Sequence, residues 1–172
     1  MKIRYFLLLT ALAGIVFLTG CSTLTKGGEA YFSYREKPFR AEVRGTIDGT
    51  VYSAEIGRTD TATHDDPLAN TYIRYLSPQA LTGLTLYVGE NGQITASLGE
   101  LSAPTNTDTV AGWLLPLTLL SECTELISVQ KEEETLALHL PQGTLYLSKD
   151  GAPTKLQSTN VKIDVVWWEW VE

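Results

Sequence analysis

The clearest pattern in the chain is an alternation of apolar and polar residues over residues 39–47. Apolar or small side chains, Val43 and Ile47 among them, occupy every second position, and charged or polar side chains lie between them. A period of two is typical of a β-strand with one buried face. Asp48-Gly49 is a tight-turn dipeptide and the pattern resumes at residues 51–56, so the two segments predict a β-hairpin.

Similar short segments follow the hairpin and predict further strands. They are bounded by turn residues and lie at residues 71–76, 83–88, 93–98, 126–130, 136–140, 143–148, 153–157 and 161–171. Pro78 and Pro104 are expected to end strands, and residues 153–157 are expected to form an edge. Together with the hairpin this gives ten candidate segments, from which about eight antiparallel strands are expected.

One segment in mid-chain has a different period. Residues 106–108 (Asn-Thr-Asp) offer helix N-caps, and apolar side chains then recur at spacings of three and four: Val110, Trp113, Leu114, Leu117 and Leu120. Pro116 interrupts the pattern, which predicts a kink or two short helices that meet there. The fold class expected is mainly β with a helical insertion after the fifth strand, because an antiparallel sheet with one apolar face must curl or be covered.

The first twenty residues have the pattern of a secretory leader. Lys2 and Arg4 precede an apolar run over residues 5–18, which is shorter than the roughly 20 residues that span a bilayer. The run ends in Leu18-Thr-Gly-Cys21, which resembles the lipobox of bacterial lipoproteins. That resemblance implies a signal peptide over residues 1–20 and a lipidated Cys21 that carries acyl chains such as palmitate. An uncleaved anchor with a chance cysteine is the alternative.

Residues 21–30 join this anchor to the rest of the chain. They contain two glycines and no apolar periodicity, which predicts a flexible tether before a domain at residues 31–172. Ser22 stands where lipoproteins retained in the inner membrane of two-membrane bacteria usually carry an aspartate. We therefore expect the protein at the extracytoplasmic face of the cell membrane, or at the outer membrane if the source has two membranes.

Composition and charge narrow the functional classes. A chain of 172 residues suits one compact domain, and 44% hydrophobic residues allow a sizeable core. There are 13 Lys and Arg against 20 Asp and Glu, which gives a formal net charge of -7. Phosphate binding needs a basic face, so a nucleic-acid partner is not expected. The acidic domain should stand off from anionic lipids on its tether.

Few residues suggest catalysis or metal binding. His64 and His139 lie far apart in the chain, so no acid–base pair is set up. His64-Asp-Asp66 offers possible metal ligands, but such a loop is more often solvated. No nucleophile elbow, phosphate loop or zinc spacing is present. We expect a protein that is not an enzyme, without a catalytic residue, metal site or cofactor. Once Cys21 is acylated, Cys123 is the remaining thiol, either buried and inert or reactive.

Several of these segments together resemble the LolA/LolB-like superfamily of envelope lipoprotein carriers. They are the strand pair at 39–52, the strand ending Tyr75-Leu-Ser-Pro78, the mid-chain apolar helix, and the strand ending at residues 147–153 (Leu-Ser-Lys-Asp-Gly-Ala-Pro). The resemblance spans residues 31–172 and implies a curved, unclosed antiparallel β half-barrel covered by an apolar helix. Carriers of this family shelter lipoprotein acyl chains in the hollow, and a spore-germination relative holds a partner protein. Soluble carriers lack an anchor, so Cys21 makes the chain more similar to the anchored receptor or to a partner-binding lipoprotein. The receptor's protruding apolar loop would map near residues 58–70, which are polar and acidic here, or near residues 78–84.

Two hypotheses of function follow from this resemblance and from the apolar segments. In the first, an apolar ligand, such as an acyl chain of a lipid or lipoprotein, lies between sheet and helix. The expected lining residues are Trp113, Leu114, Leu117, Val43 and Ile47. The same side chains can instead fill a core that needs no ligand.

In the second hypothesis the core is filled and the surface binds a protein of the envelope or spore cortex. Either a sheet edge or the C-terminal strand would provide the contact. Strict alternation places Ile163, Val165 and Trp167 on one face of that strand and Trp168 on the other. Consecutive tryptophans put at least one large ring outside the core, so Trp168 and Trp170 are the expected partner-binding residues.

Overall fold

The computed structural model describes residues 29–47, 49–60, 70–89, 92–120, 125–159 and 161–172. Two compact units are distinguished, residues 1–32 and residues 33–172, and every strand belongs to the second. The predicted signal peptide, Cys21, His64 and Cys123 lie outside the described residues, as does the side chain of Ile47. Within the described part of the chain, no helix has the length and apolar character needed to cross a membrane.

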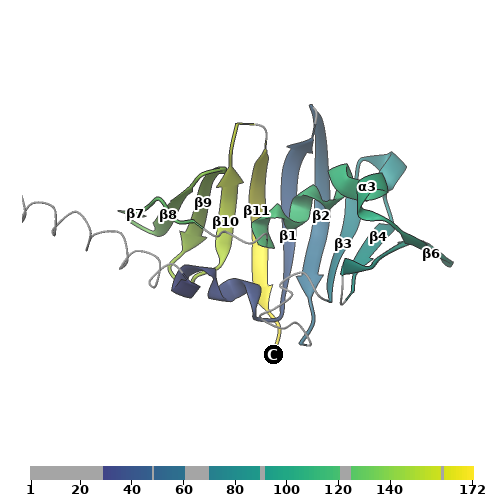
Figure 1. Cartoon of the computed structure of the whole chain (residues 1–172), viewed down its shortest axis with the longest axis horizontal. Helices are drawn as coiled ribbons and strands as arrows, with labels where there is room; N and C mark the ends of the chain where they lie inside the picture. Colours follow the sequence, from purple (N-terminus) through teal and green to yellow (C-terminus); the bar gives the residue numbers. More distant parts are fainter. Residues whose placement is uncertain (1–28, 48, 61–69, 90–91, 121–124, 160) are drawn as a thin grey trace, which may run out of the picture. The chain divides into compact units, whose positions relative to one another are not determined.

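Eleven strands form one antiparallel sheet in the second unit (Figure 1). The strands are β1 (Phe39–Ile47), β2 (Thr50–Arg58), β3 (Thr71–Ser77), β4 (Leu84–Val88), β5 (Ile94–Leu98), β6 (Leu101–Thr105), β7 (Ser128–Glu132), β8 (Thr135–Leu140), β9 (Gly143–Ser148), β10 (Pro153–Gln157) and β11 (Lys162–Trp170). Their order in the sheet is β6-β5-β4-β3-β2-β1-β11-β10-β9-β8-β7. Since β6 and β7 end the sheet on opposite sides, it is not closed into a barrel.

The predicted fold class is confirmed, but two details of the strand prediction are wrong. The sequence predicted about eight strands, and the structure has eleven. One missed strand is β6, which contains Pro104; its position at the sheet edge tolerates a residue without an N–H group. The predicted edge at residues 153–157 is β10, which lies inside the sheet between β9 and β11.

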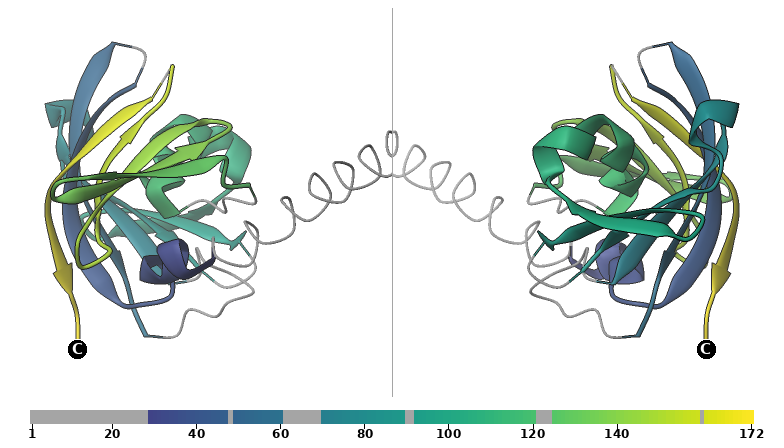
Figure 2. Two further views of the ribbon diagram at one scale, coloured as in Figure 1. Left: turned by 90° about the vertical axis from the view of Figure 1, so that its left-hand side faces the viewer. Right: turned by 90° about the vertical axis from the view of Figure 1, so that its right-hand side faces the viewer.

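The sheet curves, and its inner face carries the core. Figure 2 shows the strands bending around a helical segment on the concave side. Phe39, Ala41 and Val43 alternate along β1 and are all 0% exposed, as the period of two predicted. Other fully buried large side chains come from β2, β3, β4, β8, β9 and β11, for example Ile56, Ile73, Leu86, Leu138, Leu147 and Ile163.

The helical segment that covers this face has two parts, α3 (Thr107–Val110) and the 3-10 helix η4 (Ala111–Leu120). Asn106 caps the first part, because its Oδ1 accepts the N–H of Thr109 at 2.8 Å, which confirms the predicted N-cap. The change of helix type follows Val110, and Pro116 lies inside η4. The segment therefore consists of two short helices, as predicted, but they meet after Val110 and not at Pro116. Two shorter 3-10 helices, η1 (Glu29–Arg35) and η2 (Gln79–Leu81), complete the described elements.

A bulge in β11 changes the face on which its side chains lie. Val165 pairs with Val43, but Trp167 pairs with Glu42 and Trp168 pairs with Ala41, so Val166 is an extra residue. Directly paired residues share a face, which puts Trp168 on the inner face and Trp167 on the outer one. The prediction that Trp167 faces the same way as Val165 is wrong, because it assumed unbroken alternation.

Candidate functional site

The centre of the hollow beneath η4 is packed with side chains. Of the predicted lining residues, Val43 is 0% exposed and Leu117 is 3% exposed. Leu114 is half-buried, whereas Trp113 is 42% exposed and is not part of the lining. A 3-10 helix has three residues per turn, so Leu114, Leu117 and Leu120 form one column along η4, and Leu120 is fully buried at its end. The structure thus brings Val43 and Leu117 into one filled core.

Two tyrosine hydroxyls hold η4 against the sheet. Tyr75 of β3 donates a hydrogen bond to the carbonyl oxygen of Trp113 at 2.5 Å, near the start of η4. Tyr34 of η1 donates to the carbonyl oxygen of Leu119 at 2.6 Å, near its end. Burial raises the pKa of Tyr75, so its hydroxyl keeps its proton as a donor throughout the physiological range. The helix is therefore fastened at both ends.

A pocket of about 170 Å³ lies beside the end of η4, and it is the candidate ligand site. Its apolar walls are Leu119, Leu140, Leu145, Leu156 and Val161, and its polar lining is Arg35, Thr118, Gln142 and Ser158. Leu140, Leu145 and Leu156 come from β8, β9 and β10, which are neighbours in the sheet, and Leu119 comes from η4. None of these residues was predicted as a site residue. The alternating leucines of β8 and β9 indicate that one face of these strands is buried. Alternation alone does not show whether that face is fully packed or lines a pocket.

Arg35 gives this pocket a buried positive charge. It is 8% exposed, and its guanidinium carbon lies 5.8 Å from the centre of the Tyr34 ring. A guanidinium is always protonated in proteins, so the charge is permanent. No acidic residue belongs to the lining of the pocket as far as the chain is described. The pocket combines aliphatic walls with one cation.

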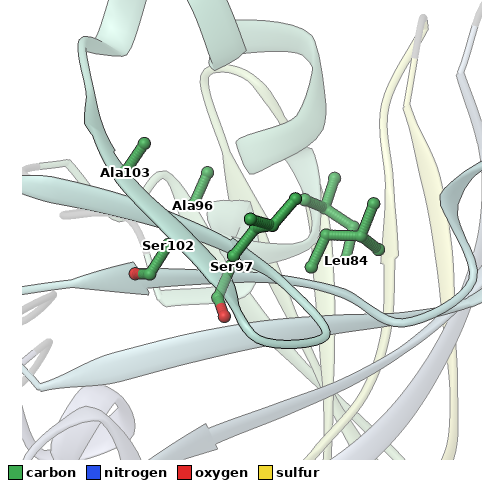
Figure 3. Close-up of a pocket in the computed structure, with 7 residues that line it drawn as sticks. Leu84, Ala96, Ser97, Ser102 and Ala103 are labelled. Carbon is green, nitrogen blue, oxygen red and sulfur yellow. The ribbon is translucent and has the colours of Figure 1, made fainter.

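A second apolar surface lies on the opposite side of the sheet centre, at strands β4, β5 and β6. A groove of about 280 Å³ is lined by Leu84, Ala96, Ser97, Leu98, Leu101, Ser102 and Ala103. Figure 3 shows Ala96 and Ala103 pointing to one side of the β5–β6 hairpin, and Ser97 and Ser102 to the other. Ala96 pairs with the buried Leu86, so the alanines lie on the inner face. Leu98 is 53% exposed and Leu101 is 76% exposed, so this end of the inner face is open.

The C-terminal tryptophans have different environments. Trp168 stacks on Phe39, with ring centres 4.1 Å apart and an interplanar angle of 14°. Trp170 meets Trp168 edge-on and lies beneath the ammonium of Lys37. Both rings are half-buried, whereas Trp167 is 39% exposed and donates from Nε1 to Glu42 at 3.2 Å. Trp167, which was not predicted as a contact residue, is the most exposed of the three.

Glu55, Tyr72 and Arg40 form a polar cluster with perturbed pKa values on the outer face, and none of them lines the pocket. Glu55 accepts hydrogen bonds from Tyr72 at 2.7 Å and from Arg40 at 3.2 Å. Partial burial raises the pKa of Glu55, but these two hydrogen bonds outweigh burial and the net pKa is lowered. His139 is half-buried, with Nδ1 3.2 Å from Thr144 Oγ1. The described residues contain no cluster of three side chains that could hold a metal ion.

Comparison with known proteins bears on the fold. No model of a protein family matches the chain, and no curated protein is significantly similar to it. Among solved structures, an uncharacterized conserved protein from Thermus thermophilus has a TM-score of 0.52 and 16% identity, over 83% of this chain and 85% of that one. A LolA superfamily protein from Nitrosomonas europaea has a TM-score of 0.43 and 9% identity, over 84% and 91% of the two chains. A putative outer membrane lipoprotein-sorting protein domain from Vibrio parahaemolyticus has a TM-score of 0.42 and 7% identity, over 83% and 90%. At these identities the likeness concerns the fold.

Proposed function

We propose that this protein is a non-catalytic binding protein of the bacterial cell envelope that holds an apolar ligand between its curved sheet and its helix. Acylated Cys21 attaches it to the extracytoplasmic face of a membrane. The observation that carries the proposal is the pocket beside Leu119, which has aliphatic walls and lies next to the filled core beneath η4. Apolar pockets with a few polar groups are the usual form of small-molecule sites.

The size of the pocket limits the ligand. A volume of about 170 Å³ lies below the roughly 300–1,000 Å³ of sites for drug-sized molecules. One short aliphatic segment, such as the end of a single acyl chain, matches this space. In this proposal Leu117 and Val43 form the packed floor beside the ligand, and Trp113 and Leu114 belong to the helix that closes over it.

The test is photo-crosslinking of the full chain in bacterial membranes with a diazirine-bearing aliphatic alcohol of eight carbons. Labelled peptides are mapped by mass spectrometry. We expect label on the pocket strands β9 and β10, and loss of that label in Thr118→Trp, because the half-buried Thr118 lines the pocket and a large ring there occupies it. Val161→Trp fills the same pocket from another side and provides a second variant.

The matched control is Val51→Trp, since Val51 is 67% exposed and lies on the outer face opposite Thr46. It should keep the pocket label. Circular dichroism of each variant reports whether the sheet is intact. Equal labelling of pocket and outer-face peptides, or label that survives both pocket-filling variants in folded protein, contradicts the proposal.

A second candidate function is binding of an envelope protein, and the open groove at β4–β6 favours it. Exposed Leu98 and Leu101 extend the apolar inner face to an edge strand that has no charged side chain. Exposed apolar surface of this kind often marks a protein contact. Trp167 adds a second exposed ring on the outer face, whereas Trp168 and Trp170 would act through packing.

The two candidates are separated by placing a photo-reactive amino acid at Leu101 in the full chain. A discrete crosslinked protein band that disappears in Leu98→Ser supports partner binding at the groove. Crosslinks to lipid alone at this position contradict it and leave the pocket proposal intact.

A further inference from the structure

We propose that β6 pairs with an extended segment of an envelope protein, and that this segment is apolar at alternate central positions and basic at both ends. The segment adds a strand to the open sheet through backbone hydrogen bonds. This pairing rests on the partner-binding candidate proposed above, and it specifies how the partner binds and what its chemistry is. The observation that carries it is the uncharged free edge of β6 beside the apolar groove.

The two edge strands of the sheet differ in charge. β7 contains Lys131 and Glu132, and such charges on an edge oppose pairing with another chain. β6 contains no charged residue, and residues 101–104 are all exposed. Figure 1 shows β6 at the end of the sheet, beyond β4. An added strand therefore meets less opposition at β6 than at β7.

The backbone of Ser102 faces the free edge. Gly99, with a φ of 60°, and Glu100 form the two-residue turn between β5 and β6, and a turn of this kind closes with a hydrogen bond between the residues that flank it. Pairs along an antiparallel ladder alternate between hydrogen-bonded and non-hydrogen-bonded. Counting from the turn, Ser102 and Pro104 belong to non-hydrogen-bonded pairs with β5. Ser102 thus offers an N–H and a carbonyl group to an added strand, and Pro104 offers a carbonyl group alone.

The groove beside this edge suits apolar side chains of an added strand. Figure 3 shows Ala103 pointing to the side of β6 opposite Ser102. Ala103, Leu98 and Leu101 line the groove, and both leucines are exposed. Alternate side chains of a strand lie on one face of the sheet. Apolar residues at every second position of the partner would therefore cover these leucines.

The charges around the edge are acidic. Residues 84–105 contain no Lys or Arg, and Glu100 is exposed at the turn before β6. Asp108 is exposed in the first turn of α3, three residues after the end of β6. Neither carboxylate forms an ion pair with any residue that the structure describes. Opposite charges on paired strands are favourable, so Lys or Arg at each end of the partner segment matches this edge.

A second copy of the chain matches the same edge less well. Each copy has a formal net charge of -7 and would bring its own Glu100 and Asp108 to the contact. Like charges on paired strands are destabilising, and two acidic proteins repel each other at longer range. The charges therefore favour a basic-ended segment of another protein.

The experiment places a photo-reactive amino acid at Leu101 of the full chain in membranes and adds biotin-labelled peptides. Each peptide has the centre Val-Thr-Val-Thr-Val. The first has lysines at both ends, the second has glutamates at both ends, and the third has lysine ends and an N-methylated centre. We expect the first to crosslink at about fivefold lower concentration than the second, because of its charges. N-methylation removes backbone donors, so the third should need about tenfold more peptide than the first.

Ser102→Pro tests the backbone of the edge. It removes the N–H that faces the added strand, so crosslinking of the lysine-ended peptide should need about tenfold more peptide. Pairing with β5 should survive, because Pro104 occupies an equivalent position on the same strand. Ser102→Ala is the matched control, since it keeps the N–H, and its effect should stay within about twofold. Circular dichroism of both variants reports whether the sheet is intact.

The combined change Glu100→Gln and Asp108→Asn tests the charges. It should bring the lysine-ended and glutamate-ended peptides to within about twofold of each other. Equal crosslinking by these two peptides in the unmodified edge overturns the basic ends of the partner.

Strand pairing is overturned if the N-methylated peptide crosslinks as well as its unmethylated form, if folded Ser102→Pro crosslinks normally, or if no peptide crosslinks at all. An envelope-protein crosslink at Leu101 that disappears in Leu98→Ser but persists in Ser102→Pro also overturns strand pairing, and it leaves partner binding at the groove standing. Crosslinks to lipid alone overturn both.

Discussion

The inner and outer faces of the sheet are formed by the same strands, yet different interactions hold them. On the inner face of β1, Phe39, Ala41 and Val43 are fully buried and contact other apolar groups. On the outer face, Arg40 and Arg44 lie in solvent and pair with glutamates at 3.2 and 3.3 Å. Buried apolar area stabilises a fold far more than exposed ion pairs do. Most of the stabilising burial is therefore on the inner face, which also holds the pocket. Substitutions on this face are expected to change both the free energy of unfolding and ligand binding.

The adjacent residues Trp168 and Trp167 give the sharpest test of this contrast. Trp168→Ala removes a ring stacked on Phe39, and we expect a loss of about 3 kcal/mol in the free energy of unfolding. Trp167→Ala removes a ring on the outer face and should lose less than about 1 kcal/mol. Urea unfolding followed by circular dichroism measures both. A larger loss for Trp167→Ala than for Trp168→Ala would contradict the placement of Trp168 on the inner face and Trp167 on the outer face by the bulge at Val166.

Gly45 provides the next largest effect. A Cβ at this position would lie 2.5 Å from the hydroxyl oxygen and 2.6–2.7 Å from two ring carbons of Tyr52, the buried residue opposite it on β2. Gly45→Ala should therefore destabilise the protein by about 2 kcal/mol, since the ring must move in a packed core. Gly112→Ala is the matched control because nothing lies within 4 Å of a Cβ there, and its effect should stay within about 0.5 kcal/mol. Thermal unfolding of both variants measures the two losses of stability. Similar losses in Gly45→Ala and Gly112→Ala would contradict the expected clash with Tyr52.

Tyr75→Phe tests the fastening of η4 without changing the shape of the core. Loss of the hydrogen bond to the Trp113 carbonyl should reduce stability by about 1 kcal/mol. Hydrogen exchange of η4 amides should become faster than exchange in β1. Tyr87→Phe serves as the control, because Tyr87 is 48% exposed and lies on the outer face opposite Tyr72. Unchanged exchange in η4 would show that this hydroxyl does not hold the helix.

The smallest expected effect is the pH dependence contributed by Glu55 on the outer face. Its pKa in the folded protein is below its ordinary value of 4.5, so the ionised form favours the fold. That contribution is fully present above about pH 4.5 and is lost as the pH falls through the folded-state pKa. Glu55→Gln should lower the free energy of unfolding by less than about 1 kcal/mol at pH 7, and the difference should shrink toward pH 3. Denaturant titrations of both proteins across this range measure it, and a constant difference would contradict the assignment.

Local patterns were sufficient to predict much of the fold. The alternation from Phe39 placed β1 and its buried face, and Asn106 marked the start of the helical segment, because each depends on neighbours in sequence. The strand at β6 was missed because Pro104 is tolerated only through the position of that strand at the edge. The bulge at Val166 was missed because register is set by pairing with β1, far away in the chain.

The candidate site could be predicted less well from the sequence than the fold. Val43 and Leu117 were expected to line a hollow for a ligand, and the structure shows both side chains buried in the packed core. The pocket instead combines Arg35, near the start of the domain, with leucines of β8, β9 and β10. No periodicity links these segments. These segments come together because β11 pairs with β1, which places strands β7–β10 in the same sheet as β1–β6.

The fastened helix also acts as a competitor for the hollow that it covers. Its residues Leu117, Leu119 and Leu120 are at most 3% exposed and occupy the space that a larger guest would need. Burial of each leucine contributes about 1.5–3 kcal/mol, so three leucines oppose displacement by about 5–9 kcal/mol. At about 1.4 kcal/mol per tenfold, a guest that must displace η4 loses roughly three to six powers of ten in apparent affinity. A ligand that enters beside Leu119 avoids this competition, so the closed helix itself discriminates by size in favour of short single chains.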